Sequence, residues 1–304
     1  MSIFSRREAL RGFAALGLGA TLPAAAVASP KPLRAHHSVS AHSFTIGEAT
    51  VTVIRDTTFQ LSLDQVVANA PDGAAAALFN EFGLPTDGVP TDVCQVIIDV
   101  GDVRVLVDTG TGTELVATMN ALGMDPASVD RLLISHFHGD HVGAVSADGQ
   151  PTFPNASVHI AAPELAFLDG FTGDSNSVAN TLQTLAPVRD RLQPFADGAE
   201  LAPGLRALAA NGHTPGHAAF LLDDGGQRLL IAGDALVHPV TSFQHPEWAF
   251  GFDMDREAAA AARTRVLDLA VTEGYPLCAA HLPFPSTGYV GRDGDAYRFT
   301  PASL

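Results

Sequence analysis

The chain has 304 residues, enough for one large domain or two small ones. Apolar residues make up 46% of it, which argues against general disorder. Acidic residues outnumber basic ones by 33 to 17, and the formal net charge of -16 argues against a nucleic-acid partner because such a surface repels phosphate backbones.

The segment that ends at Ala28 has the composition of an export signal. Arg6 and Arg7 belong to a charged start, an apolar run follows from Phe13, and small residues precede a cleavage point after Ala28. The apolar run is too short to span a bilayer. The paired arginines are typical of a twin-arginine signal, although Ala9 stands where that signal usually has Phe. We therefore expect a periplasmic or secreted protein without a stable membrane anchor.

Alternating apolar and polar residues predict strands and helices in both halves of the chain. In the first half these are a strand pair at Phe44–Glu48 and Val51–Asp56, a partly helical excursion at 57–91, a hairpin of Cys94–Asp99 and Val103–Asp108, a helix at Thr113–Leu122 and a strand at Arg131–Ser135. In the second half they are strands at Ser157–Ala161, Leu205–Ala210, Ala218–Leu222, Arg228–Ala232 and Leu277–Ala280, and a helix that begins after Asp255 and ends at Gly274.

This order of elements predicts an α+β fold in which two sheets are sandwiched between helices. No Gly/Ser linker separates the halves, so we expect one domain at 43–304, preceded by the signal at 1–28 and a flexible, Pro- and Ser-rich tail at 29–42. Cys94 and Cys278 each lie in an apolar, strand-like run. Two buried thiols are therefore favoured over a disulfide, which the sequence alone leaves open.

The central motif is H-x-H-x-D-H, formed by His136, His138, Asp140 and His141 at the end of a predicted strand. On an extended backbone the first two histidines point the same way, so both imidazoles can reach one ion. The turn at Gly139 directs the last two residues toward a neighbouring point. Neutral imidazoles and carboxylates suit Zn²⁺ and its first-row neighbours better than Ca²⁺.

Three further candidate ligands follow predicted strands: His213, Asp234 and His281. A single histidine at a strand end is more often a packed or surface residue than a ligand. Three such residues after the H-x-H-x-D-H motif instead favour a metal centre.

The order of these seven residues resembles the metallo-β-lactamase superfamily, over about residues 43–304. The resemblance implies a four-layered αβ/βα sandwich with two divalent metal ions at one edge. The expected ion is zinc, with Mn, Fe or Co as alternatives. It implies a first site of His136, His138 and His213, a second of Asp140, His141 and His281, and a bridging Asp234. It further implies that Asp108 and His217 orient ligands, and for these two ordinary structural hydrogen bonding is an equal alternative.

The implied chemistry is hydrolysis by a hydroxide that bridges the two metals, with Asp140 and Asp234 as the catalytic carboxylates. The C-terminal tail and the excursion at 57–91 look most like the methyl parathion hydrolase group and its lactonase and arylesterase kin. The expected substrate is therefore a small apolar ester, lactone or phosphotriester. Small acyl-homoserine-lactone lactonases usually carry a tyrosine between the histidine motif and the bridging Asp. That variant is disfavoured here, because Tyr275, Tyr289 and Tyr297 all come later.

Two other activities remain alternatives at this point: a mono-iron persulfide dioxygenase-like oxidoreductase and a glyoxalase II-like thioester hydrolase. A non-catalytic metal-binding module is a third, and a homodimer is compatible with the sequence. Five aromatic residues in loop-like segments are candidates for an apolar substrate pocket, with core packing as the alternative for each. They are Phe167, Phe171, Phe243, Trp248 and Phe250.

The export signal leads to a first prediction. Replacing Arg6 and Arg7 together by Lys should leave the protein in the cytoplasm with its signal uncleaved, because the twin-arginine route requires both guanidinium groups. Cell fractionation with detection of the cleaved and uncleaved forms measures this. Normal periplasmic delivery of the double variant would contradict the twin-arginine interpretation.

Overall fold

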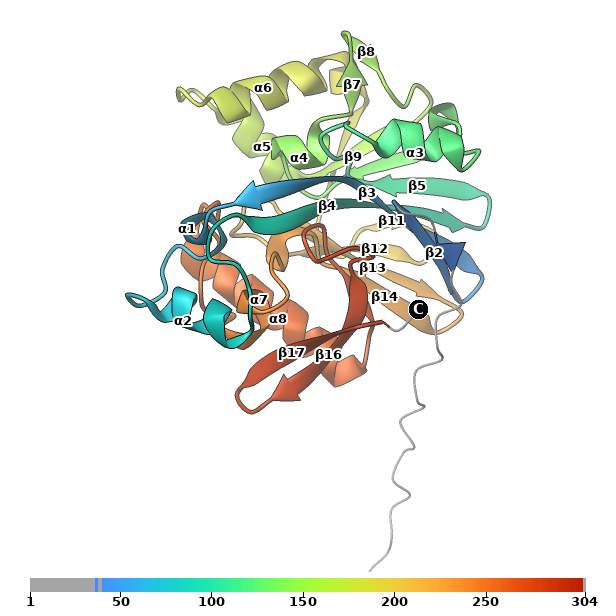
Figure 1. The fold of residues 1–304 in the computed structure, drawn as a ribbon. Helices are drawn as coiled ribbons and strands as arrows, with labels where there is room; N and C mark the ends of the chain where they lie inside the picture. The colour runs from blue at the N-terminus through green and yellow to red at the C-terminus, as the bar shows by residue number, and fades with distance from the viewer. Residues whose placement is uncertain (1–35, 38–39, 303–304) are drawn as a thin grey trace, which may run out of the picture. The chain divides into compact units, whose positions relative to one another are not determined.

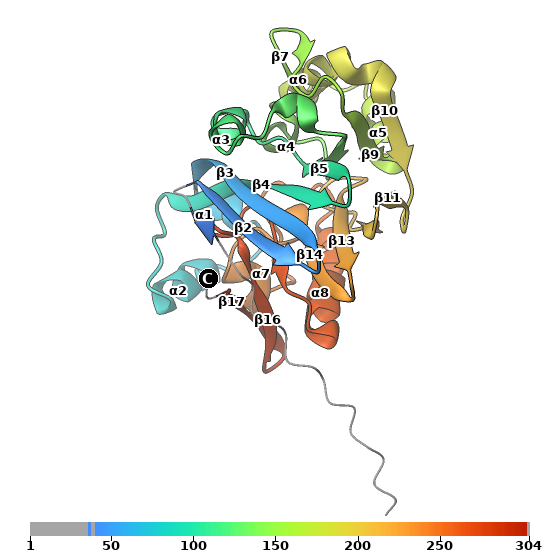
Figure 2. The same ribbon diagram turned by 90° about the vertical axis from the view of Figure 1, so that its right-hand side faces the viewer.

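The computed structural model describes residues 36–37 and 40–302, which belong to the compact unit Pro32–Leu304. The predicted signal at 1–28 lies outside the described residues. Two large sheets pack face to face in this unit (Figures 1 and 2).

The first sheet is mixed, antiparallel at its N-terminal side and parallel at the other. In spatial order its strands are β1 (His36–His37), β2 (Ala41–Ile46), β3 (Ala49–Leu61), β4 (Val89–Val100), β5 (Val103–Val107), β6 (Arg131–Ile134), β9 (Ser157–Ala161) and β10 (Leu192–Phe195). Strands β5, β6, β9 and β10 run parallel to one another. The segments that follow β5 and β6 therefore leave the sheet at the same edge.

The second sheet is antiparallel except for one parallel pair, β14 and β15. Its strands are β11 (Glu200–Ala202), β12 (Leu205–Ala209), β13 (Ala218–Asp224), β14 (Gln227–Ile231), β15 (Leu277–Cys278), β16 (Thr287–Asp293) and β17 (Ala296–Pro301). A separate small hairpin consists of β7 (Ser146–Ala147) and β8 (Gln150–Pro151).

Helices cover the outer face of each sheet (Figures 1 and 2). The helices on the side of the first sheet are α3 (Leu115–Ala121), α4 (Gly139–Val142), α5 (Ala162–Gly170) and α6 (Asn176–Leu185). The helices on the side of the second sheet are α7 (Thr241–Gln244) and α8 (Arg256–Glu273). Between β3 and β4 lie α1 (Leu63–Val66) and α2 (Ala74–Glu81), and short 3-10 turns are formed by Pro126–Ser128, Ala186–Arg191 and Gly233–Ala235.

The central strands bury side chains on both faces. Val53 and Ile98 of the first sheet pack in the same cluster as Phe220 and Ile231 of the second, between the sheets. On the other face of the first sheet, residues such as Ile97 pack toward the covering helices. Burial on two faces explains why these strands are nearly continuous apolar runs. The predicted four-layered sandwich is confirmed.

The cap residues of the long helix are also confirmed. The carboxylate of Asp255 accepts a hydrogen bond from the amide of Ala258 at 3.0 Å, and Gly274, the residue after the last residue of α8, caps the helix with φ of 69°. Cys94 and Cys278 are free buried thiols in the core between the sheets, and burial raises the pKa of Cys278 to about 12. Both observations agree with what the sequence favours.

Two predicted boundaries need correction. The tail predicted at 29–42 includes strand residues, because His36–His37 pair with β2, which itself begins at Ala41. The excursion predicted at 57–91 is shorter, because β3 continues to Leu61 by pairing with the start of β4. Thr57, Phe59 and Leu61 are half-buried and Thr58 and Gln60 are exposed, which is the alternation of a strand with one face toward solvent. This extension carries β3 beyond the core, toward the site described below.

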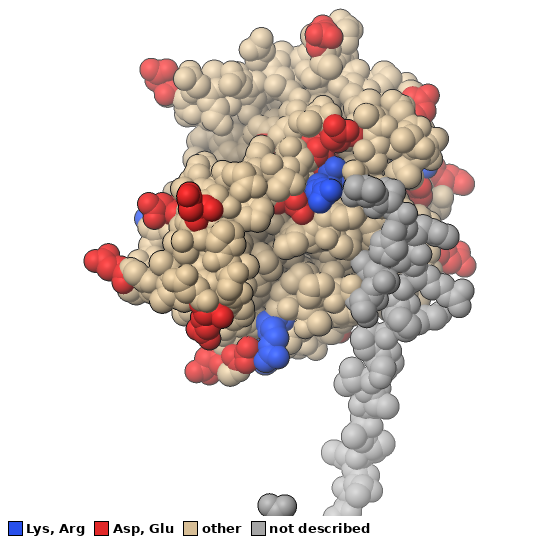
Figure 3. Space-filling view, viewed as in Figure 1, with Lys and Arg blue, Asp and Glu red and all other residues tan. Residues whose placement is uncertain are grey.

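Acidic side chains are spread over the face in Figure 3 and basic ones are few there, as a net charge of -16 requires. Among the helices of the described residues, none is long and apolar enough to cross a membrane.

Candidate metal centre

Strand ends of both sheets deliver the candidate ligands to one place. His136 and His138 follow β6 in the first sheet, and His213 follows β12 in the second. Asp234 and His281 follow β14 and β15, which run parallel with Ile231 opposite Cys278. The two residues therefore leave the second sheet at the same edge.

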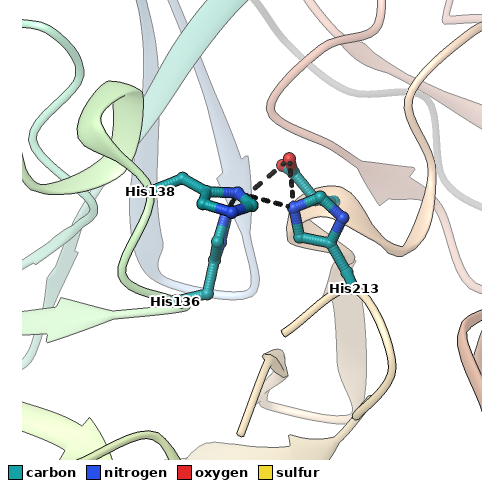
Figure 4. Close-up of side chains that lie close together, drawn as sticks. His136, His138 and His213 are labelled. Atoms are coloured by element: carbon teal, nitrogen blue, oxygen red, sulfur yellow. Dashed lines mark hydrogen bonds and ion pairs between the residues drawn. The ribbon is translucent and has the colours of Figure 1, made fainter. Parts of the chain in front are cut away.

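Three histidines form the first cluster, with their rings pointing toward one another in Figure 4. The Nδ1 atom of His138 lies 3.0 Å from the Nε2 atom of His136 and 3.0 Å from the Nε2 atom of His213. An oxygen of Asp234 lies 3.2 Å from the Nε2 atom of His213. These four atoms are close enough to share one ion, since Zn–N bonds are about 2.0–2.1 Å long.

The second cluster contains Asp140, His141 and His281. An oxygen of Asp140 lies 3.4 Å from the Nε2 atom of His281 and 3.8 Å from the Nε2 atom of His141. His141 and His281 are buried, whereas the side chain of Asp140 keeps 21% of its surface exposed. This carboxylate is therefore accessible to solvent or a substrate.

Asp234 lies between the two clusters. Its Oδ1 atom is 3.2 Å from the Nε2 atom of His141, and its Oδ2 atom is 3.2 Å from the Nε2 atoms of both His213 and His281. Oδ1 thus faces a ligand of the second cluster, and Oδ2 faces one ligand of each cluster. The structure brings all seven candidate ligands together, in one group of His136, His138, His213 and Asp234 and another of Asp140, His141 and His281.

The buried polar atoms of the centre fit divalent cations. The Nε2 atom of His141 and the Oδ1 atom of Asp234 are buried and have no hydrogen-bond partner among the described residues. Such atoms are costly unless a further group satisfies them. Two facing acceptors are satisfied by a cation, and a set of imidazole nitrogens and carboxylate oxygens suits zinc.

Burial and charge shift the pKa values of the histidines in opposite directions. Burial lowers the pKa of His136 well below its ordinary value and that of His138 to about 3, so both rings are neutral, as ligands must be. Burial also acts against protonation of His141, but the carboxylates of Asp234, Asp108 and Asp140 outweigh it and raise the pKa of that ring. These three carboxylates place negative charge around the ring of His141.

The two residues predicted to orient ligands contact them directly. His141 Nδ1 donates to an oxygen of Asp108 at 2.9 Å, which leaves Nε2 directed at Asp234. Asp108 is fixed in turn by the amide and hydroxyl of Ser135, at 2.8 and 2.7 Å. His217 Nδ1 donates to the carbonyl of Ala210 at 3.1 Å, and its Nε2 accepts the backbone amide of Asp234 at 2.9 Å.

Sequence reasoning missed the residues that orient two further histidines, His213 and His281. His213 Nδ1 donates to Asp253 at 2.9 Å, and His281 Nδ1 donates to the backbone carbonyl of Asp92 at 2.8 Å. Asp253 is buried and also binds Arg263 at 3.1 Å, and these two partners hold its pKa below the ordinary value although burial raises it. Nothing in the local sequence distinguishes Asp253, because only the fold brings it to His213.

A cavity of about 370 Å³ opens beside the metal centre. Four ligand candidates, His138, Asp140, Asp234 and His281, line it together with apolar side chains and two hydroxyl-bearing residues. The apolar walls are Phe59 and Leu61 of β3 and the loop residues Phe250 and Phe252, and the hydroxyls belong to Thr91 and Ser177.

The sequence suggests five aromatic residues for the substrate pocket. Of these five, only Phe250 lines the cavity, so the prediction is corrected for the other four. Phe243 is fully buried in the same cluster as residues of α8, with its ring 5.3 Å from that of Phe299, and Trp248 belongs to the cluster beside α2. Phe167 and Phe171 pack against the core under the first sheet. The apolar surface of these four side chains is buried in the core. Local sequence does not distinguish a buried aromatic residue from one that lines a pocket.

The contact between Asp253 and His213 leads to a second prediction. Asp253→Asn should weaken zinc binding by about 10–100-fold, because the amide cannot accept hydrogen bonds from both His213 and Arg263 as the carboxylate does. A competition titration with a chromophoric chelator measures the affinity. Asp255→Asn is a matched control because asparagine also caps helices. Unchanged zinc affinity in Asp253→Asn would show that this carboxylate does not orient the ligand.

Comparisons with known proteins identify the family to which the chain belongs. Residues 90–281 match the family model described as the metallo-beta-lactamase superfamily. The uncharacterized protein YobT of Bacillus subtilis is 31% identical over 167 residues, which are 52% of this chain and 69% of that protein. The N-acyl homoserine lactonase AttM of Azorhizobium caulinodans is 37% identical over 118 residues, but the match covers 35% of this chain and only 41% of AttM.

The fold has solved counterparts as well. The structure of AidC, described as a dizinc quorum-quenching lactonase in complex with a homoserine product, superposes with a TM-score of 0.82. The alignment covers 87% of this chain and 98% of AidC at 20% sequence identity, so it shows the shared fold. The family match and the fold lead to one conclusion: the chain belongs to the metallo-beta-lactamase superfamily and is a metal-dependent hydrolase of that superfamily.

Proposed function

We propose that the chain hydrolyses lactones and esters that carry an apolar chain, using two divalent metal ions, most simply zinc. The observation that carries this proposal is the cavity of about 370 Å³, which joins the ligand candidates Asp140 and Asp234 to walls of phenylalanine and leucine. An apolar pocket with a few convergent polar groups is the usual form of a small-molecule site. Apolar phosphotriesters share this reaction class and belong in the same tests.

The named relatives support a lactone among the substrates. AttM and AidC are both described as lactonases, and AidC as a dizinc enzyme. The tyrosine expected in small homoserine-lactone lactonases has no counterpart in the cavity lining of the described residues. Tyr297, for example, is buried and donates its hydroxyl to Asp268 at 2.7 Å. The support for a lactone substrate therefore comes from the described activity of these relatives, the metal centre and the pocket, and not from a shared tyrosine.

The chain's own residues have separate tasks in this reaction. Two divalent cations, when bound, supply Lewis acidity and lower the pKa of water from ~15.7 toward neutrality. Asp234 contacts both ligand clusters, since its carboxylate lies 3.2 Å from His213 of the first cluster and 3.2 Å from His141 and His281 of the second. Asp140, which lines the cavity, is placed to take the proton of the attacking water.

The reaction balances with this one proton carrier. A bond forms between the water oxygen and the carbonyl carbon, and the bond from that carbon to the leaving oxygen breaks. The proton taken up by Asp140 then passes to the leaving oxygen. Phe59, Leu61 and Phe250 exclude bulk water from the reacting carbonyl, which strengthens each electrostatic interaction there.

A substrate panel tests the proposal. With the zinc-loaded protein we expect turnover of aryl esters and homoserine lactones. From acetyl to hexanoyl substrates kcat/KM should rise by up to about 200-fold, since four further CH₂ groups are buried at about 0.8 kcal/mol each. Steady-state kinetics measure this. Absence of turnover for every lactone and ester, or turnover of phosphotriesters alone, would contradict the proposal.

The wall of the cavity offers a matched pair of variants. Phe252→Ala should lower kcat/KM for hexanoyl substrates by about 10-fold and leave acetyl substrates nearly unaffected, because it removes apolar area of the cavity wall that a longer chain would cover. Phe82→Ala is the control, since Phe82 is 46% exposed and Phe252 44%, but Phe82 does not line the cavity. Equal effects of the two variants would argue that substrates do not occupy this cavity.

A further inference from the structure

Glu164 is a fully buried carboxylate outside the set of candidate ligands. It belongs to the first turn of α5, which directly follows β9. A buried charge is costly unless hydrogen bonds compensate it. Burial raises the pKa of Glu164, and the donors from Thr214, Phe137 and Gly216 oppose this rise.

The two oxygens of Glu164 bind two segments that come from different sheets. Oε1 accepts the backbone amide of Phe137 at 2.8 Å, and this residue lies between the ligand candidates His136 and His138. Oε2 accepts the hydroxyl of Thr214 at 2.9 Å and the amide of Gly216 at 2.7 Å. Thr214 directly follows His213, so one carboxylate connects the backbones that hold all three histidines of the first cluster.

Two further contacts hold these segments against the carboxylate. The hydroxyl of Thr181 in α6 donates to the carbonyl of Phe137 at 2.8 Å. The backbone N–H and C=O of Phe137, the residue between the two histidines, are therefore both hydrogen-bonded. Gly216 packs on the backbone of Glu164 so closely that an added Cβ would lie 2.2 Å from the Glu164 nitrogen. The segment after His213 therefore has little freedom to shift relative to α5.

We infer that Glu164 is a positioning residue for the first metal cluster, acting through the backbones of Phe137 and of the segment that follows His213. The inference rests on the proposed di-metal centre and deepens it. A carboxylate is required because both oxygens must accept. In glutamine the NH₂ group would face the amide of either Phe137 or Gly216, and that donor would lose its acceptor.

The second cluster has different supports. His141 is oriented by Asp108, and His281 by the backbone carbonyl of Asp92. Neither contact involves Glu164. A loss of the Glu164 carboxylate should therefore weaken one metal site selectively, whereas a general loss of stability would weaken both.

Zinc titration of single-site backgrounds tests this selectivity. His281→Ala leaves the first cluster complete, and His213→Ala leaves the second complete. In the His281→Ala background, adding Glu164→Gln should weaken Zn²⁺ binding by about 10–100-fold, the usual effect of losing a group that orients ligands. In the His213→Ala background it should leave the affinity unchanged. Competition with a chelator measures the affinities, and circular dichroism checks the fold.

Thr214→Val provides a milder variant in case Glu164→Gln does not fold, since it removes one of the three donors and keeps the carboxylate. It should weaken the same site by a smaller factor. Equal losses in both backgrounds, or no loss in either, would overturn the role of Glu164. Absence of Zn²⁺ binding in both backgrounds before Glu164 is changed would overturn the proposed di-metal function together with this inference.

Discussion

The structure of the centre depends on the carboxylate of Asp234, which faces histidines delivered by both sheets. His141 comes from the first sheet and approaches Oδ1, whereas His213 and His281 come from the second and approach Oδ2. A carboxylate can give each oxygen to a different cation and supply negative charge between two cations that repel each other. The packing of the two sheets is therefore linked to the spacing of the two clusters.

Buried acids surround the histidines and determine how each ring points. Asp108 receives the Nδ1 proton of His141, and Asp253 that of His213, so each ring presents Nε2 to the centre. Glu164 acts one step further out, on the backbone of the first cluster. The negative charge of these carboxylates attracts cations. Bound metal ions can compensate this charge while the histidine ligands stay neutral.

The sequence identifies the residues that the structure brings together at the centre, because each follows a recognisable local pattern. The H-x-H-x-D-H motif and three strand-end residues need only an extended backbone and a turn to be recognised. The remaining features depend on contacts between distant segments. Asp253 reaches His213 across 40 positions of sequence, and Glu164 reaches Gly216 across 52. Likewise, Phe59 lines the cavity only because β3 continues along β4 beyond the core, whereas Phe243 is buried in the same cluster as residues of α8.

The most direct test of this account is the metal content of the protein and of Asp234→Asn, measured together with kcat. We expect two ions per chain in the unmodified protein. In the variant one ion should be lost and kcat should fall by at least ~100-fold, the size of effect seen when an electrostatic group at a reacting centre is removed. The fold should persist because asparagine is nearly isosteric with aspartate. An Asp234→Asn protein that keeps both ions and turns over substrate at a near-normal rate would contradict the account.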